Sequence, residues 1–184
     1  ICDKPKDFKI DPEKIVIAGD SVGGNMATVT ALRSSIEKGP KILFQLLFYP
    51  VTNSEMNTES YKNFSDGPWL TGKAMEWFWQ AYEPDREKRK HPFISPINAT
   101  GDELKNLPPA LIITAENDVL RDEGEAYAAK LDLSGVKTAN IRINGTIHDF
   151  MVLNAIAHTE PVKAAFLLAS KTIKQVFKGG NNVF

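Results

Sequence analysis

The sequence predicts an α/β fold in which a mostly parallel sheet is flanked by helices. Two apolar runs, residues 15–18 and residues 42–48 with the single polar residue Gln45, lie about one helix apart, which is the spacing of a βαβ unit. Two further strands are predicted over residues 110–115 and 138–143. The continuous apolar character of the first run predicts burial on both faces of the sheet.

The composition indicates ordinary globular protein, since 42% of the 184 residues are hydrophobic and 24% are charged. A net charge of -1 offers no basic field to a nucleic acid, so we expect a small neutral partner. No apolar run approaches the roughly 20 residues of a membrane span. The single cysteine, Cys2, excludes an internal disulfide and favours a reducing compartment, so we expect a cytoplasmic protein.

Helical periodicity is expected between and after the strands. Val22, Met26 and Val29 recur at helical spacing, and the pair Gly39 and Pro40 ends that helix.

Two later helices carry their own start signals. Asp122 and Glu125 predict a capping box for a helix over residues 123–133. Pro161 is expected in the first turn of a closing helix.

Residues 52–108 are expected to form a loop and helix insertion, and residues 1–184 together to form part of a single domain. Thr71 can cap an aromatic helix in this segment. The apolar side chains on one side of that helix form either a small satellite core or a wall that faces a substrate: Met75, Phe78, Trp79 and Tyr82, with Trp69 and Trp77 adding bulk. The mixed charge run over residues 85–90 predicts a solvated loop.

The first strand runs into a G-x-S-x-G pattern formed by Gly19, Ser21 and Gly23. This pattern, between a strand and a helix, is typical of a nucleophile elbow, whose strained turn exposes the serine hydroxyl above the sheet. The alternative is a structural Gly/Ser turn without chemistry. The helix that follows aims free N–H groups at the serine, so the Val22 N–H is predicted to form one half of an oxyanion hole.

A nucleophilic serine needs a base, and the chain offers three histidines. His148 lies in a glycine-containing loop just beyond a strand, in the order Ser, Asp, His. His91, beside a proline, and His158, at a helix end, lack that setting. We therefore predict His148 as the base.

A carboxylate must also orient the base. Asp118 directly follows a buried strand and leads among the acids, because the carboxyl ends of parallel strands face the ligand crevice. Asp122 and Asp149 are its rivals, and each has a simpler role, as a helix cap and as loop surface respectively.

Three motifs in this order resemble those of the hormone-sensitive-lipase-like esterases, a family of the α/β-hydrolase fold. They are G-D-S-V-G-G-N over residues 19–25, L-P-P-A-L-I-I-T-A-E-N-D-V-L-R-D-E-G-E-A-Y-A over residues 107–128, and G-T-I-H-D-F-M over residues 145–151. The family more often has glycine where Asp149 follows the histidine. The pair Ser95 and Pro96 is also in the style of the family.

The resemblance implies an α/β-hydrolase-type fold and a carboxylic-ester hydrolase in which Ser21 is the nucleophile, His148 the base and Asp118 its orienting acid. Short or medium acyl esters would be cleaved through an acyl-enzyme intermediate, with no metal and no organic cofactor. The alternative is a non-catalytic, receptor-like module, as in plant hormone receptors of this fold in which the catalytic histidine is replaced.

One family feature is missing from the sequence. Members carry a His-Gly-Gly signature upstream of the elbow that completes the oxyanion hole, and nothing before Ile15 contains it. Four strands are predicted, against about eight in the family fold. We therefore expect the chain to correspond to the C-terminal half of such a domain. An N-terminal segment, another chain or a second copy in a homo-oligomer would complete it. The alternative is an inactive fragment.

Overall fold

The computed structural model describes residues 1–179. Its sheet has four strands in the order β1-β2-β3-β4, and every neighbouring pair is parallel. The strands are β1 (Val16–Asp20), β2 (Phe44–Phe48), β3 (Ala110–Asn117) and β4 (Thr138–Ile147). All four predicted strands and their parallel arrangement are therefore confirmed.

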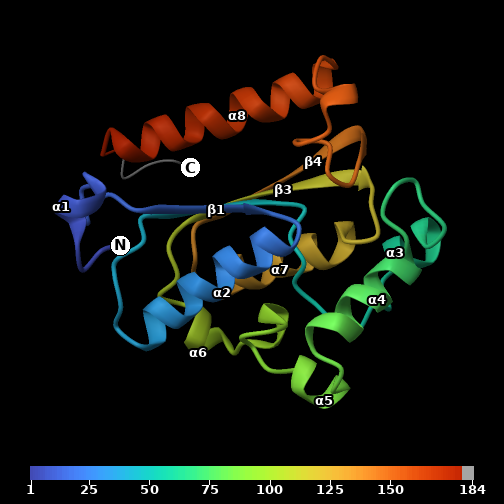
Figure 1. Cartoon of the computed structure of the whole chain (residues 1–184), viewed down its shortest axis with the longest axis horizontal. Coiled ribbons are helices and arrows are strands. Elements are labelled where there is room, and N and C mark those ends of the chain that lie inside the picture. Colours follow the sequence, from blue (N-terminus) through green and yellow to red (C-terminus); the bar gives the residue numbers. More distant parts are fainter. Residues whose placement is uncertain (180–184) are drawn as a thin grey trace.

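Helices cover both faces of this sheet, as Figure 1 shows. Helix α8 (Glu160–Phe177) lies along one face, while α2 (Val22–Ile36) and α7 (Arg121–Leu133) lie along the other. Strand side chains alternate between the two layers, since Leu47 packs with the α2 and α7 side and Leu46 with the α8 side. The predicted α/β class, with a parallel sheet between helices, is confirmed.

The segment between β2 and β3 contains four α-helices, one short 3-10 helix and no strand. The α-helices are α3 (Glu59–Phe64), α4 (Gly72–Tyr82), α5 (Arg86–Arg89) and α6 (Gly101–Leu104). Thr71 caps α4 as predicted, because its Oγ1 accepts a hydrogen bond of 3.1 Å from the Ala74 N–H. Within residues 1–179, no helix has both the length and the apolar character needed to cross a bilayer. Three short helical elements complete the described chain: α1 (Pro5–Phe8), η1 (Pro96–Asn98) and η2 (Asn154–Ile156).

The predicted capping box of α7 is wrong. The residue at the N-cap is Leu120, which makes no side-chain cap. Asp122 instead accepts a hydrogen bond of 2.7 Å from the Ser60 N–H, and Glu125 pairs with Arg142 at 2.7 Å. Distant parts of the chain therefore take both carboxylates that a local cap would have used.

The buried face of α2 is not the apolar stripe that its sequence displays. Val22 and Met26 are 54% and 56% exposed, whereas Asn25, Thr28 and Leu32 are buried. Small and polar side chains face the sheet here because α2 crosses it closely. The Thr28 hydroxyl is satisfied by the buried Gln45 and Tyr127 side chains.

Two further local predictions are wrong. Ala18 is exposed, because β1 is an edge strand of the described sheet and is not covered on both faces. The charge run contains a short helix, α5, and its Arg89 is buried. The guanidinium of Arg89 donates a hydrogen bond to the Glu83 carbonyl oxygen at 2.6 Å, which accounts for its burial.

Because β1 and α2 cross closely, one added methyl group at Gly19 is expected to lower the stability of the fold strongly. A Cβ on Gly19 would lie 2.1 Å from the Gly23 carbonyl oxygen, so Gly19→Ala must push strand and helix apart. We expect the free energy of unfolding to fall by roughly 3 kcal/mol, at the upper end of overpacking effects. Gly23→Ala is the control, because its Cβ meets nothing closer than 3.6 Å. Equal urea midpoints for the two variants would contradict this account.

Candidate active site

Ser21 occupies the turn between β1 and α2 with φ +51° and ψ −122°, a conformation that L residues rarely adopt. Backbone hydrogen bonds hold it there. The Ser21 N–H donates to the Phe48 carbonyl oxygen at 2.9 Å, and the Ser21 carbonyl oxygen accepts from the Val51 and Asn25 N–H groups, both at 3.2 Å. The predicted elbow is thus a strained turn that is fixed from the adjacent strand.

The structure brings the three sequence-predicted side chains together in one hydrogen-bonded line. His148 Nε2 lies 2.9 Å from Ser21 Oγ, and His148 Nδ1 lies 2.7 Å from Asp118 Oδ2. The other oxygen of Asp118 accepts from the Leu120 N–H at 3.0 Å. Because a carboxylate only accepts hydrogen bonds, the His148 proton belongs on Nδ1, which leaves Nε2 free to accept from Ser21.

Neighbouring strands and their loops set the position of the imidazole. Asp118 comes directly after β3, and His148 directly after β4. The Asn117 amide donates to the Thr146 carbonyl oxygen at 3.2 Å, which ties the two loops together. The ring of Tyr49, beyond β2, meets the His148 ring edge-on at 4.8 Å between centroids. The histidine, 2% exposed, therefore has little freedom to turn.

The other candidate histidines and acids lie apart from the hydrogen-bonded line of Ser21, His148 and Asp118, or have other partners. His91 and His158 are exposed, and His91 Nδ1 accepts from the Phe93 N–H at 3.1 Å. Asp122 binds Arg121 and Ser60. Asp149 is different, because its Oδ1 lies 3.4 Å from His148 Nε2. In the described part of the chain, no group of three or more His, Cys, Asp and Glu side chains is arranged to hold a metal ion.

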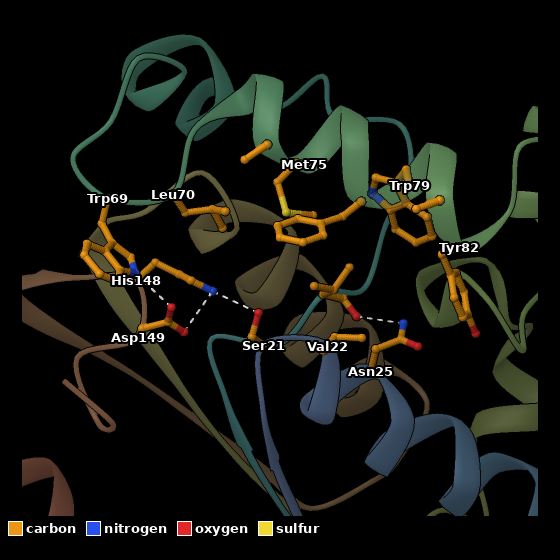
Figure 2. Close-up of a pocket in the computed structure, with 14 residues that line it drawn as sticks. Ser21, Val22, Asn25, Trp69, Leu70, Met75, Trp79, Tyr82, His148 and Asp149 are labelled. Atoms are coloured by element: carbon orange, nitrogen blue, oxygen red, sulfur yellow. Dashed lines mark hydrogen bonds and ion pairs between the residues drawn. The ribbon is translucent and has the colours of Figure 1, made fainter.

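A pocket of about 600 Å³ opens above Ser21, and Figure 2 shows α4 running across it. Leu70, Met75 and Trp79 project from the α4 side toward Ser21, which lies opposite them. Met75 and Trp79 also belong to a satellite core with Tyr61. The two interpretations of this aromatic helix therefore both hold, since it packs as a small core and lines the pocket.

Asn25 is a residue of this site for which no role was predicted from the sequence. Its amide donates hydrogen bonds of 2.9 Å to both the Val51 and the Ile94 carbonyl oxygens. These bonds tie α2 to the segment beyond β2 and to the loop after α5. The signal was its place in the elbow motif, directly after Gly23 and Gly24 on the first turn of α2.

Comparison with known proteins identifies the family. The profile of the α/β-hydrolase fold matches residues 1–152, most of the chain. The chain belongs to the α/β-hydrolase fold family. A putative α/β hydrolase of Acanthamoeba polyphaga mimivirus is 46% identical over 175 residues, which cover 95% of this chain and 51% of the relative. An ethyl acetate hydrolase of Pseudomonas putida is 35% identical over 150 residues, 80% of this chain and 46% of the relative.

Solved structures agree with this membership of the α/β hydrolases. A thermostable esterase from Pseudomonas putida superimposes with a TM-score of 0.92 at 46% identity, over 94% of this chain and 54% of that one. An esterase of the archaeon Pyrobaculum calidifontis gives a TM-score of 0.85 at 38% identity, over 96% and 55% of the two chains. The resemblance to hormone-sensitive-lipase-like esterases is confirmed. The chain spans about half the length of the relatives it matches.

Behind the hydrogen-bonded line lies a second buried acid, Glu123, in the first turn of α7. Its Oε1 accepts from the Thr52 and Asn53 N–H groups at 2.7 and 3.0 Å. Burial raises the pKa of Glu123 to about 8, with a further contribution from the negative charge of Asp118. Glu123 thus anchors the segment beyond β2 to α7, and it is protonated at neutral pH.

The raised pKa of Glu123 predicts that stability depends on pH. Between its ordinary pKa of 4.5 and about 8, the folded state keeps a proton that the unfolded state has lost, so stability falls as pH rises. The slope from this residue is at most about 1.4 kcal/mol per pH unit. Glu123→Gln should remove that slope from urea midpoints measured between pH 5 and 8. Glu13→Gln, at an exposed carboxyl, is the control and should keep the slope. An unchanged slope in Glu123→Gln would refute the assignment.

Proposed function

We propose that this site belongs to a carboxylic-ester hydrolase that works through an acyl-serine intermediate. Ser21 is the nucleophile, His148 the general base and Asp118 the acid that orients the base. The observation that supports this most directly is the continuous line from Ser21 Oγ through His148 to Asp118, with contacts of 2.9 and 2.7 Å. These are the distances and the order that serine hydrolysis requires.

In the first half-reaction, Ser21 Oγ attacks the ester carbonyl carbon while His148 Nε2 takes the hydroxyl proton. Asp118 stays ionised and stabilises the imidazolium that forms. His148 then gives the proton to the leaving alkoxide, and the acyl group remains on Ser21. Water repeats the sequence in the second half-reaction, with His148 again as the base, and releases the carboxylic acid.

The negative charge of the tetrahedral intermediate needs hydrogen-bond donors. Val22 is the first residue of α2, a position whose N–H has no acceptor within the helix, and it lines the pocket. We assign this N–H as one oxyanion donor. The sequence expectation places a second donor on a segment upstream of Ile15, so the proposal concerns the native gene product that contains these residues.

The pocket favours neutral esters with an apolar group, and we propose short or medium acyl chains. Its wall is mostly apolar and aromatic, including Leu70, Phe78 and Tyr82, and a cavity of about 600 Å³ suits a small molecule. The similar Pseudomonas putida protein is described as an ethyl acetate hydrolase. A receptor-like role has less support, because simple binding does not require the line of Ser21, His148 and Asp118.

Replacement of the nucleophile gives the first test of this function. Ser21→Ala should lower kcat for p-nitrophenyl esters of short acids by about 10⁴-fold or more, as removal of a catalytic serine does elsewhere. Ser35→Ala, on the same helix, is the control. A receptor would bind such esters without turnover in all forms. If Ser21→Ala retains more than a tenth of the native rate, the assignment fails.

Comparison of the three histidines gives a second test. His148→Ala should lower kcat by roughly 10³-fold or more, because Ser21 then has no base. His91→Ala and His158→Ala should change kcat by less than about twofold, since both residues are exposed and have no contact with Ser21. Circular dichroism checks that each variant is folded. An equal loss in His91→Ala and His148→Ala would show that the base has been misassigned.

A further inference from the structure

Asp149 contacts the proposed base at the atom that exchanges the proton. Its Oδ1 lies 3.4 Å from His148 Nε2, the same nitrogen that lies 2.9 Å from Ser21 Oγ. Asp118 contacts the other ring nitrogen, Nδ1. The imidazole therefore lies between two carboxylates, and only Asp118 has the orienting role that the sequence predicted.

Trp69 fixes the position of Asp149. Its indole N–H donates a hydrogen bond of 2.8 Å to Asp149 Oδ2, across 80 residues of sequence. Both residues have positive φ, +68° for Trp69 and +65° for Asp149. A bulky residue such as tryptophan adopts this conformation only where its surroundings impose it. Figure 2 shows the indole, the carboxylate and the imidazole side by side at one end of the pocket.

We propose that Asp149 is a second catalytic carboxylate, which stabilises the protonated form of His148 during ester cleavage while Trp69 holds it in place. This inference rests on the proposed function. In the resting site Nε2 presents a lone pair to Ser21, so a carboxylate beside it gains nothing. Once Ser21 has given up its proton, Nε2 carries N–H and positive charge, and the same carboxylate becomes favourable. The interaction is therefore stronger in the transition state than in the ground state, which is what accelerates a reaction.

Asp149 takes no proton in this scheme. The proton moves from Ser21 Oγ to His148 Nε2 and then to the leaving oxygen, and the Asp149 charge stays constant. The bond from Trp69 matters because a free carboxylate could close onto Nε2–H and compete with the leaving group. With Oδ2 fastened to the indole, Oδ1 stays at 3.4 Å, close enough for attraction but long for a hydrogen bond.

Other groups also face the His148 imidazole, and they are the same in the native protein and in a variant at Asp149. Asp118 faces it from the end of β3 and Ser21 from the elbow. Tyr49 faces it from the end of β2, and burial keeps the pKa of its phenol well above the usual range, so it is uncharged. The negative charge of Asp20, at the end of β1, also raises the pKa of the Tyr49 phenol. Replacement of Asp149 therefore removes one charge and leaves the others in place.

Asp149→Asn separates charge from shape. Asparagine tolerates positive φ and keeps an oxygen for the Trp69 N–H, while an uncharged NH2 group replaces the Oδ1 that faces His148 Nε2. We expect kcat to fall roughly tenfold with little change in KM, less than for a fully buried group because the carboxylate is partly exposed. Since the unprotonated base is the reactive form, the acid limb of the kcat/KM profile should also move to lower pH. A merely structural residue would not move that limb.

Trp69→Phe removes the N–H and keeps an aromatic ring in the wall. If the indole acts through Asp149, Trp69→Phe should lower kcat several-fold in the native background and have little further effect in Asp149→Asn. Trp77→Phe is the matched control, because Trp77 is 65% exposed and does not line the pocket.

The outcomes separate this inference from the proposed function. A native protein without esterase activity, or an active Ser21→Ala variant, would overturn both. A native protein that is active and dependent on Ser21, but whose kcat and acid limb are unchanged in a folded Asp149→Asn variant, would overturn the role of Asp149 alone. Additive losses in Trp69→Phe and Asp149→Asn would overturn the role of Trp69.

Discussion

The close crossing of β1 and α2 is the constraint on which the site depends. The backbones approach so tightly at Gly19 and Gly23 that a single Cβ on Gly19 would overlap a carbonyl group. The chain can turn from strand to helix in so little space only if Ser21 takes a positive φ. Such a conformation costs on the order of 1–3 kcal/mol, and the bonds to Phe48 and Val51 offset it. The strain is what turns the serine hydroxyl toward His148.

Parallel pairing then brings the partners of Ser21 to the same edge. Because all four strands point the same way, the loops after β1, β3 and β4 emerge together, and they carry Ser21, Asp118 and His148. β2 lies between β1 and β3, so its own loop, with Tyr49, fills the space beneath the imidazole. Sheet order thus brings together two residues 127 positions apart, and the turn at Ser21 completes their hydrogen bond.

The sequence predicted those parts of the fold that depend on residues close together in the chain. The strands are largely apolar runs, or in β4 an alternating pattern, and Ser21, Asp118 and His148 each follow a strand in the expected order, so pattern and spacing were enough. Prediction failed where a residue distant in sequence determines the partner of a side chain. Asp122 has the right spacing for a helix cap, but Ser60 takes its carboxylate. Asp149 has the character of a surface loop residue until Trp69, 80 residues away, is placed beside it.

Polar anchors, more than apolar contact, fix the pocket wall relative to Ser21. The segment between β2 and β3 packs on the scaffold through a small core, which could slide, since apolar contacts have little directionality. Three directional links prevent this: Asn25 to Ile94, Asp122 to Ser60, and Glu123 to Thr52 and Asn53. All of them begin on α2 or α7, the helices that pack directly on the sheet.

This division of roles separates the parts of the pocket wall that can vary in size from those that cannot. Side chains on the pocket face of α4, such as Phe78 and Tyr82, take no part in these hydrogen bonds and are half exposed. Their size can therefore change without disturbing the turn at Ser21. Asn25 and Glu123 have no such freedom, because each satisfies two backbone groups that would otherwise lose their partners. Under the proposed function, substrate choice is therefore separable from ester cleavage, except at Trp69, where the pocket wall contacts Asp149 and through it the proposed base.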